Sequence, residues 1–392
     1  MTALRILADA NIPCVEESFG AFGPVRTKPG REIGPSDVEA ADVLLVRSVT
    51  PVGPRLLGET ELRFVGSATI GTDHVDQAYL RGRGIPFAHA PGSNADSVAD
   101  YVVAALLRLA RRRRVPLRGR TVGVVGCGNI GGRLARRLPA LGLRVLKNDP
   151  PRARAAEAEG RSHPFVSLNT VLDAADIVTF HVPLTNEGPD PTHHLGDAAF
   201  LSHLRDGAWL LNTSRGSVVD GEALLAARTQ GPVAAAVLDV WEHEPAPSPA
   251  LVQAVDIATP HIAGYAYDGK VRGTEMLYRA LCSEIGVTPE WGGTATIRPA
   301  TKDALQCTPP DPRLPATEWR HHLAQQAYDL QADDTALRAI PDAPREARSE
   351  AFQRLRKTYR RRREMKQHAV PQAAVPGAYS QAVEEGLTLQ WA

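Results

Sequence analysis

Short apolar runs recur along most of the chain and are separated by longer polar or amphipathic stretches. A continuous apolar run bounded by turn residues is typical of a strand buried on both faces of a parallel sheet. Eight such runs are Ile6–Ala8, Val43–Val46, Phe64–Ala68, Val122–Val125, Ile177–Phe180, Trp209–Asn212, Ala234–Leu238 and Ile257–Ala258. Strands that alternate with helical crossovers in this way predict a doubly wound α/β fold.

Two long stretches between these runs have helical spacing of apolar residues. One is 96–113, whose last turn carries arginines that suit the C-terminal end of a helix dipole, and the other is 271–285. We expect 96–113 to connect two α/β domains. After Trp291 the composition changes, and 291–314 is rich in Pro, Thr and Gly, which indicates a linker.

The pattern beyond the linker differs from the rest. It predicts helices over 319–331 and 346–367 and a short strand over 387–391. About 80 residues build a modest core at best, so we expect this segment to bury its apolar face against a partner, such as a second subunit.

The length of 392 residues exceeds one ordinary core and predicts two or three domains. The predicted boundaries are 1–98 with 265–288, then 99–264, then 289–392, which gives two Rossmann-like doubly wound parallel-sheet domains and a small α+β C-terminal domain. Closure of the first two lobes is expected, with hinges near 95–100 and 264–270.

The composition bears on which kinds of partner to expect. A hydrophobic content of 43%, a charged content of 23% and a net charge of +1 give no reason to expect nucleic acid or a membrane as the main partner. The first predicted strand begins almost at once and no apolar run reaches membrane length, so we expect neither a signal peptide nor a membrane span, and a cytoplasmic protein. The scattered cysteines predict no disulfide and no zinc site. His193 and His194 are expected to lack a matching acid and to be surface or loop residues, and no metal is predicted.

Gly126, Gly128 and Gly131 form a G-x-G-x-x-G turn directly after the run Val122–Val125. This spacing suits a dinucleotide, because the turn is tight, the backbone is bare and a helix N-terminus faces the pyrophosphate. Asn129 and Ile130 belong to the same turn, and the next predicted strand ends at Asp149, where an acid would accept hydrogen bonds from the ribose. The sequence therefore predicts NAD as the cofactor, in preference to NADP.

Polar residues follow the strands, and the carboxyl ends of parallel strands are where ligands bind. In the first domain Ser48 and Thr69 are candidates to donate to a substrate carboxylate, with Arg47 adding charge. It is equally plausible that Ser and Thr at such positions cap helices or form hydrogen bonds within turns.

Arg215, Asp239, Glu244 and His261 follow three successive predicted strands of the cofactor domain. Oxidation of a 2-hydroxy acid needs a cation for the carboxylate, which Arg215 would supply in bidentate fashion, and a base for the hydroxyl proton, which His261 would supply. Glu244 would orient the ring. Each residue alone has an ordinary structural explanation, but the set favours catalysis.

Several motifs occur in one order: Gly71-Thr-Asp-His-Val-Asp, the glycine turn, His181-Val-Pro-Leu, Leu211-Asn-Thr-Ser-Arg-Gly, Leu238-Asp-Val-Trp-Glu-His-Glu-Pro and Thr259-Pro-His-Ile-Ala-Gly-Tyr. With them the chain resembles the D-isomer-specific 2-hydroxyacid dehydrogenases. The similarity extends to Val46-Arg-Ser-Val-Thr and to Leu355-Arg-Lys-Thr-Tyr, and so covers nearly the whole chain.

The resemblance implies a function. Its narrower part is similar to members that oxidise 4-phospho-D-erythronate to 2-oxo-3-hydroxy-4-phosphobutanoate with tightly held NAD, in the synthesis of pyridoxal 5′-phosphate. It implies that Arg215 binds the carboxylate, that His261 accepts the proton and that Glu244 completes the pair. It further implies that Thr179, Asp239 and Gly264 help to hold NAD, and that Ser48, Thr69 and Tyr265 touch a phosphorylated 2-hydroxy acid.

The resemblance also implies that the C-terminal segment makes a homodimer. The first two domains supply few cations for a substrate phosphate, so an arginine of the run 360–363, Arg362, is a hypothetical ligand contributed by the partner subunit. Two alternatives stay open: another D-2-hydroxyacid dehydrogenase acting on phosphoglycerate, glycerate or a simple 2-oxo acid, and a regulator that senses NAD on the same fold.

Overall fold

The computed structural model describes residues 3–297 and 305–392, and the chain divides into two compact units. The first unit comprises the described residues of 1–94 and 266–299, and the second comprises those of 95–265 and 300–392. The middle of the predicted linker, 298–304, lies outside the described residues. The division into three domains therefore stays a prediction.

The first unit holds one parallel sheet in the order β2-β1-β3-β4-β5. Its strands are β1 (Ile6–Asp9), β2 (Val25–Lys28), β3 (Val43–Val46), β4 (Phe64–Ser67) and β5 (Phe87–His89). Its helices are α1 (Val15–Phe19), α2 (Pro35–Val38), α3 (Pro54–Leu57), α4 (Gln77–Gly82), α12 (Tyr267–Glu284) and α13 (Gly293–Ile297). Helix α12 begins four residues before the predicted position, with Asp268 in its first turn.

Separate apolar clusters cover the two faces of this sheet. Leu277 and Leu281 of α12 pack with α1 on one face, and Leu57 and Leu80 of α3 and α4 pack on the other. The strands therefore read as continuous apolar runs because both of their faces are buried.

The second unit holds a six-stranded parallel sheet in the order β11-β10-β9-β8-β6-β7. Its strands are β6 (Thr121–Val125), β7 (Arg144–Asn148), β8 (Ile177–Phe180), β9 (Ala208–Asn212), β10 (Val233–Leu238) and β11 (Ile257–Ala258). Its helices up to the C-terminal segment are α5 (Ala95–Arg113), α6 (Asn129–Arg137), α7 (Pro150–Ala158), α8 (Leu168–Ala174), α9 (Ala198–Ser202), α10 (Gly221–Gln230) and α11 (Pro249–Ala254).

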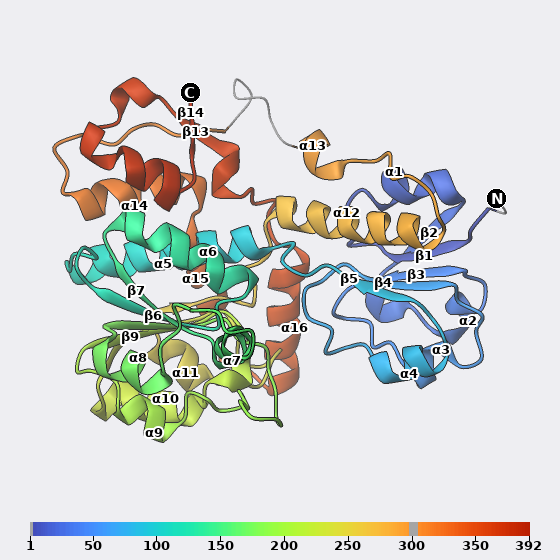
Figure 1. Ribbon diagram of the computed structural model, residues 1–392, viewed down its shortest axis with the longest axis horizontal. Helices are drawn as coiled ribbons and strands as arrows, with labels where there is room; N and C mark the ends of the chain where they lie inside the picture. The colour runs from blue at the N-terminus through green and yellow to red at the C-terminus, as the bar shows by residue number, and fades with distance from the viewer. Residues whose placement is uncertain (1–2, 298–304) are drawn as a thin grey trace. The chain divides into compact units, whose positions relative to one another are not determined.

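Helices lie on both faces of this sheet, as Figure 1 shows within the second unit. Helices α5 and α6 pack on one face, and α8 to α11 pack on the other. Strand β6 is flanked by β7 on one side and β8 on the other, so the strand order reverses at β6. Ligands of doubly wound sheets bind at this reversal, and the glycine turn follows β6 directly. The predicted doubly wound fold is confirmed.

The C-terminal segment packs on the same unit. It contains α14 (Ala316–Ala327), α15 (Leu330–Arg338), α16 (Arg345–Lys357) and a small parallel sheet of β12 (Leu305–Gln306), β13 (His368–Val370) and β14 (Gln390–Trp391). Trp319 and Leu323 of α14 are buried in one core with Tyr101 and Leu106 of α5. The apolar face that the sequence assigned to a partner is therefore covered, on α14, by the chain's own α5.

Two predicted helices of this segment were wrong in extent. The predicted 319–331 is two helices, because Asp329 caps α15 by accepting from the Ala332 amide at 3.2 Å. The predicted 346–367 ends at Lys357, since the arginines beyond it bond to other parts of the unit, and only the short 3-10 turn Met365–Gln367 is helical. The last strand is also shorter than the predicted 387–391. In the part of the chain that the structure describes, no helix is long and apolar enough to cross a membrane.

Candidate active site

The glycine turn after β6 has the geometry that a pyrophosphate requires. Gly126 has φ +87°, and a Cβ there would lie 2.7 Å from the His181 carbonyl oxygen. A Cβ on Gly131 would lie 1.9 Å from the Gly126 carbonyl oxygen, so helix and strand meet there without a side chain. At Gly128 a Cβ would meet nothing within 4 Å, which leaves the backbone open to a ligand at the start of α6.

Asp149 lies beside this turn, just after β7. Its Oδ2 accepts from the Cys127 amide at 2.8 Å, and its Oδ1 accepts from the Arg152 amide at the start of α7. The carboxylate is thus fixed at the end of β7, at the position of the predicted ribose acid. Cys127 is buried, and burial raises the pKa of its thiol to about 11, so it spaces the turn and is no nucleophile. These residues fit a dinucleotide.

Thr179 is buried in β8, and its hydroxyl is 2.9 Å from Nε2 of His181. Burial lowers the pKa of His181 to about 3, so this ring is neutral at physiological pH. Thr179 therefore holds the His181 ring at the edge of the sheet. Its predicted contact with NAD stays a prediction.

The acid and base candidates meet after the neighbouring strands β10 and β11. His261 Nδ1 lies 2.7 Å from Glu244 Oε2, and the Trp241 amide donates to Glu244 Oε1 at 2.9 Å. The His261 side chain is 35% exposed, so a substrate can reach the ring. Because Nδ1 faces the carboxylate, Nδ1 carries the proton and Nε2 is left as the acceptor.

Burial alone would raise the pKa of Glu244. The charge and hydrogen bond of His261, with the Trp241 amide and the charge of Arg356, outweigh burial and hold the pKa of Glu244 below its ordinary value. Glu244 is therefore a carboxylate throughout the neutral range, which is the form that orients an imidazole.

Asp239 builds the loop that carries His261. Its Oδ1 accepts from the Thr259 hydroxyl at 2.6 Å and from the Ile262 amide at 2.8 Å, and its Oδ2 accepts from the Ala263 amide at 2.9 Å. The Asp239 carbonyl accepts from the His261 amide at 2.7 Å, and His261 has φ +56°. Burial raises the pKa of Asp239. The described contacts assign Asp239 to shaping this loop, and its predicted contact with NAD, like that of Gly264 in the same loop, stays a prediction.

Arg215 follows β9, the strand next to β10. A Cβ on the following Gly216 would lie 2.0 Å from the Trp241 carbonyl carbon, so the Arg215 turn packs directly on the loop that carries Glu244. Asn212 holds the turn, since its Nδ2 donates to the Arg215 carbonyl at 2.9 Å. The structure thus places Arg215, Glu244 and His261 at the carboxyl ends of three adjacent strands, as predicted.

Arg356 of α16 lies near the acid and base candidates, and the sequence analysis did not single it out. Its guanidinium lies 5.4 Å from the centre of the Tyr265 ring, and its charge acts on Glu244. Its Nε is buried and has no hydrogen-bond partner among the described residues. Arg356 lies 112 positions after Glu244 (356 − 244 = 112), and nothing local marks it as a ligand.

The structure describes Arg362 within the second unit. The side chain is buried within its own unit, where it donates to the Ala263 carbonyl at 2.7 Å and stacks 4.0 Å from the centre of the Tyr328 ring. This hydrogen bond ties Arg362 to the loop that carries His261, and its predicted contact with a partner's substrate stays a prediction. Its charge faces Asp100 and Asp333 of the same unit.

Arg47, Ser48 and Thr69 belong to the first unit. Ser48 is exposed after β3, and the Thr69 hydroxyl donates to the Gly71 carbonyl at 3.0 Å. The Thr69 contact matches the reading of this residue as part of a turn. A role of all three in substrate binding stays a prediction.

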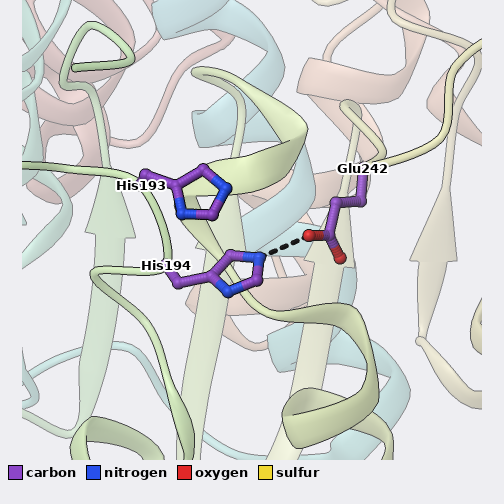
Figure 2. A group of neighbouring side chains, drawn as sticks. All are labelled: His193, His194 and Glu242. Carbon is purple, nitrogen blue, oxygen red and sulfur yellow. Dashed lines mark hydrogen bonds and ion pairs between the residues drawn. The ribbon is translucent and has the colours of Figure 1, made fainter. Parts of the chain in front are cut away.

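One prediction about histidines was wrong. His194 does have a matching acid, because its Nε2 is hydrogen-bonded to Oε1 of Glu242, 48 positions later in the chain (Figure 2). Only the fold brings these residues together, so sequence spacing gave no signal.

Comparisons with known proteins show the family of this chain. The family described as D-isomer specific 2-hydroxyacid dehydrogenase, NAD binding domain, matches residues 99–263, and a domain of unknown function matches residues 315–384. A D-lactate dehydrogenase from Aquifex aeolicus, solved with NAD and lactic acid, has a TM-score of 0.59 at 25% identity, covering 72% of this chain and 95% of that chain.

Two curated relatives are similar over nearly their whole length. The erythronate-4-phosphate dehydrogenase of Salinibacter ruber is 72% identical over 390 residues, covering 100% of both chains. The erythronate-4-phosphate dehydrogenase of Azotobacter vinelandii is 48% identical, covering 92% of this chain and 93% of that one. With its NAD-binding sheet and its histidine–glutamate pair, the chain belongs to the erythronate-4-phosphate dehydrogenase family within the D-isomer specific 2-hydroxyacid dehydrogenases.

Proposed function

We propose that the protein oxidises 4-phospho-D-erythronate to 2-oxo-3-hydroxy-4-phosphobutanoate with NAD, as a step in the synthesis of pyridoxal 5′-phosphate. The observation that carries the proposal is the His261–Glu244 pair, 2.7 Å apart, beside the Arg215 turn on a sheet with a dinucleotide turn. The choice of substrate is supported by relatives up to 72% identical, which are erythronate-4-phosphate dehydrogenases.

The roles of the residues follow from the chemistry of a 2-hydroxy acid. Arg215 binds the substrate carboxylate through paired N–H groups and so fixes the orientation of the neighbouring carbon. His261 removes the hydroxyl proton at Nε2, while Glu244 holds Nδ1–H and stabilises the charged ring. NAD, when bound, accepts the hydride from the carbon that bears this hydroxyl.

The residues of the glycine turn are proposed to hold the cofactor. Gly126, Gly128, Asn129, Ile130 and Gly131 would present backbone amides to the pyrophosphate, and Asp149 would accept from the adenosine ribose. The open face at Gly128 and the fixed Asp149 carboxylate support this placement.

Arg356 is proposed as a cation for the substrate phosphate. Its guanidinium lies against the Tyr265 ring, its charge acts on Glu244, and its buried Nε has no hydrogen-bond partner among the described residues. A guanidinium in this state has donors left for an anion, and phosphate is the anion that a bidentate arginine binds well. Arg362 stays a second candidate, since its Nε and Nη1 also have no hydrogen-bond partner among the described residues.

Isotope transfer tests the reaction. 4-Phospho-D-erythronate deuterated at C2 is incubated with the protein and NAD, and the mass of the NADH formed is measured by mass spectrometry. The proposal predicts one deuterium in NADH and none in the keto acid product. Unlabelled NADH, or no NADH, would overturn direct hydride transfer from C2.

We also propose a homodimer formed through residues 289–392, on the resemblance of this segment to the dimerisation domain of related dehydrogenases. The argument from an uncovered core no longer supports it for α14, which α5 covers. Light scattering coupled to size-exclusion chromatography measures the mass of the assembly, and a dimer should have twice the chain mass of 42.2 kDa. A mass equal to one chain at micromolar concentration would reject the proposal.

A further inference from the structure

We propose that His193, His194 and Glu242 form a binding site for a divalent transition-metal ion of the zinc class. The two histidines lie in the loop between β8 and α9, and Glu242 lies in the loop after β10. This site is separate from the predicted catalytic residues, and it does not depend on the identity of the substrate.

The three side chains converge on one point, as Figure 2 shows. One ligand atom from each residue can be chosen so that all three lie within 4.8 Å of one another. The imidazole rings are stacked with centres 4.1 Å apart and planes 22° apart, and Nε2 of His194 meets Oε1 of Glu242.

The donor set selects the ion. Two imidazoles and one carboxylate suit zinc and its neighbours in the first transition row, whereas calcium and magnesium prefer oxygen donors alone. Bonds of about 2.0–2.2 Å place donors roughly 3–3.5 Å apart. The donor atoms, now up to 4.8 Å apart, must therefore approach one another by about an ångström. His193 can make this shift because its side chain is exposed. Water would complete the coordination.

The backbone that carries the donors is held in place. Thr192, just before the histidines, donates its hydroxyl to the Pro183 carbonyl at 2.6 Å, and its amide bonds to the Thr185 carbonyl at 2.9 Å. The His194 amide donates to the Ser217 carbonyl at 2.7 Å. A site on fixed backbone loses little entropy when the ion binds.

A second carboxylate supports the arrangement from outside. Asp220 Oδ2 lies 3.9 Å from Nδ1 of His194, while the Gly221 amide donates to Glu242 Oε2 at 3.2 Å. Asp220 is within ion-pair range of the ring but is not hydrogen-bonded to it, and an outer carboxylate orients a metal-binding imidazole when it forms that hydrogen bond. The structure thus supplies two donor rings, an inner acid and an outer acid.

The site joins segments that matter for the predicted chemistry. Glu242 is two residues from Glu244, and the Ser217 carbonyl that holds His194 is two residues from Arg215. An ion bound here would therefore tie both loops to the histidine loop and stiffen the second unit. Zinc should raise the melting temperature.

The test uses untagged full-length protein with Co²⁺ as a spectroscopic substitute for Zn²⁺. Equilibrium dialysis counts the bound ions, and the visible bands of Co²⁺ report nitrogen and oxygen coordination. Wild type should bind one ion per chain, displaced by Zn²⁺. His193→Ala and Glu242→Gln should each weaken binding by about 10–100-fold, as loss of a metal-supporting group does. The matched control His203→Ala, at an exposed histidine at the end of α9, should bind as wild type.

Thermal unfolding shows whether a variant has lost its metal site or its fold. His193 is exposed, so His193→Ala should melt like wild type without metal, and Zn²⁺ should raise the melting temperature of wild type but not of this variant. Binding in His193→Ala and Glu242→Gln equal to that of wild type, or no Co²⁺ bound by wild type at tenfold excess, would overturn the proposal.

Discussion

His261 Nδ1 lies 2.7 Å from Glu244 Oε2, on a loop that the Asp239 carboxylate holds through three hydrogen bonds. The pair joins the ends of two adjacent strands, β10 and β11. Because the carboxylate fixes Nδ1, the other nitrogen is the only one available to the substrate hydroxyl. The account of catalysis rests on this relationship.

Glu244→Gln should lower kcat by about 10²-fold or more, because the amide does not hold one tautomer or stabilise the charged ring. NAD affinity, measured by quenching of protein fluorescence, should not change. Glu222→Gln, at an exposed residue on α10, is the matched control and should keep wild-type kcat. Equal kcat in the Glu244 variant would remove Glu244 from the mechanism.

His261→Ala should keep NAD binding and lose turnover, since the ring faces the substrate hydroxyl rather than the dinucleotide. The expected fall in kcat is about 10²–10⁴-fold. Titration with NAD and single-turnover kinetics on the same preparation separate the two effects. Loss of NAD binding together with turnover would contradict the assigned role.

Arg356→Ala should raise KM for 4-phospho-D-erythronate by about 10–100-fold, the loss expected for one hydrogen bond to a charged group. The value of kcat/KM for unphosphorylated D-erythronate should change little. Arg354→Ala, at an exposed position on the same helix, serves as the control. An equal loss on both substrates would show that Arg356 supports structure and does not bind phosphate.

Arg362→Ala should destabilise the fold, because it removes a buried cation that faces Asp100 and Asp333. It also leaves the buried Ala263 carbonyl without this donor, and an unsatisfied buried polar group costs about 1–3 kcal/mol. Urea unfolding measures the difference, with Lys357→Ala, an exposed cation at the end of α16, as a control expected within about 0.5 kcal/mol of wild type. A stable Arg362→Ala protein with weakened substrate binding alone would support the earlier hypothesis.

His321 predicts a pH dependence of stability. Burial, together with the charges of Arg111, His322 and Arg108, lowers the pKa of this residue of α14 to about 4. The unfolded chain therefore binds the proton first, so stability is full above about pH 6.5 and falls as the pH drops toward 4. Between pH 6.5 and 5 the loss from this group is about 2 kcal/mol. His321→Leu should flatten that part of the urea-unfolding profile and His203→Leu should not, whereas parallel profiles for wild type and His321→Leu would refute the assignment.

The strands were predictable because they are buried on both faces. Val43–Val46 and Ile177–Phe180 occur as predicted, since a strand between two helical layers is mostly apolar, and the one buried hydroxyl in them, on Thr179, is hydrogen-bonded to His181. Helix 346–367 was predicted too long because its charges have helical spacing, while Arg362 bonds to the Ala263 carbonyl instead. The break in 319–331 had a local signal, the cap Asp329.

The candidate site also contains residues that the sequence predicts and residues that it does not. Arg215, Glu244 and His261 follow strand ends, so the topology of a parallel sheet alone places them at one edge. The contacts of Arg356 and of the His194–Glu242 pair join loops and helices that are far apart in the chain. Tertiary packing alone determines which of these residues come into contact. Sequence spacing carries no record of such contacts.

Single-turnover formation of NADH is the most direct test of the central claim. NAD-loaded protein is mixed in parallel with 4-phospho-D-erythronate, 3-phospho-D-glycerate, D-glycerate and D-lactate, and NADH absorbance is followed. The account predicts a burst with 4-phospho-D-erythronate alone. A burst only with another acid, or none with any of them, would contradict it.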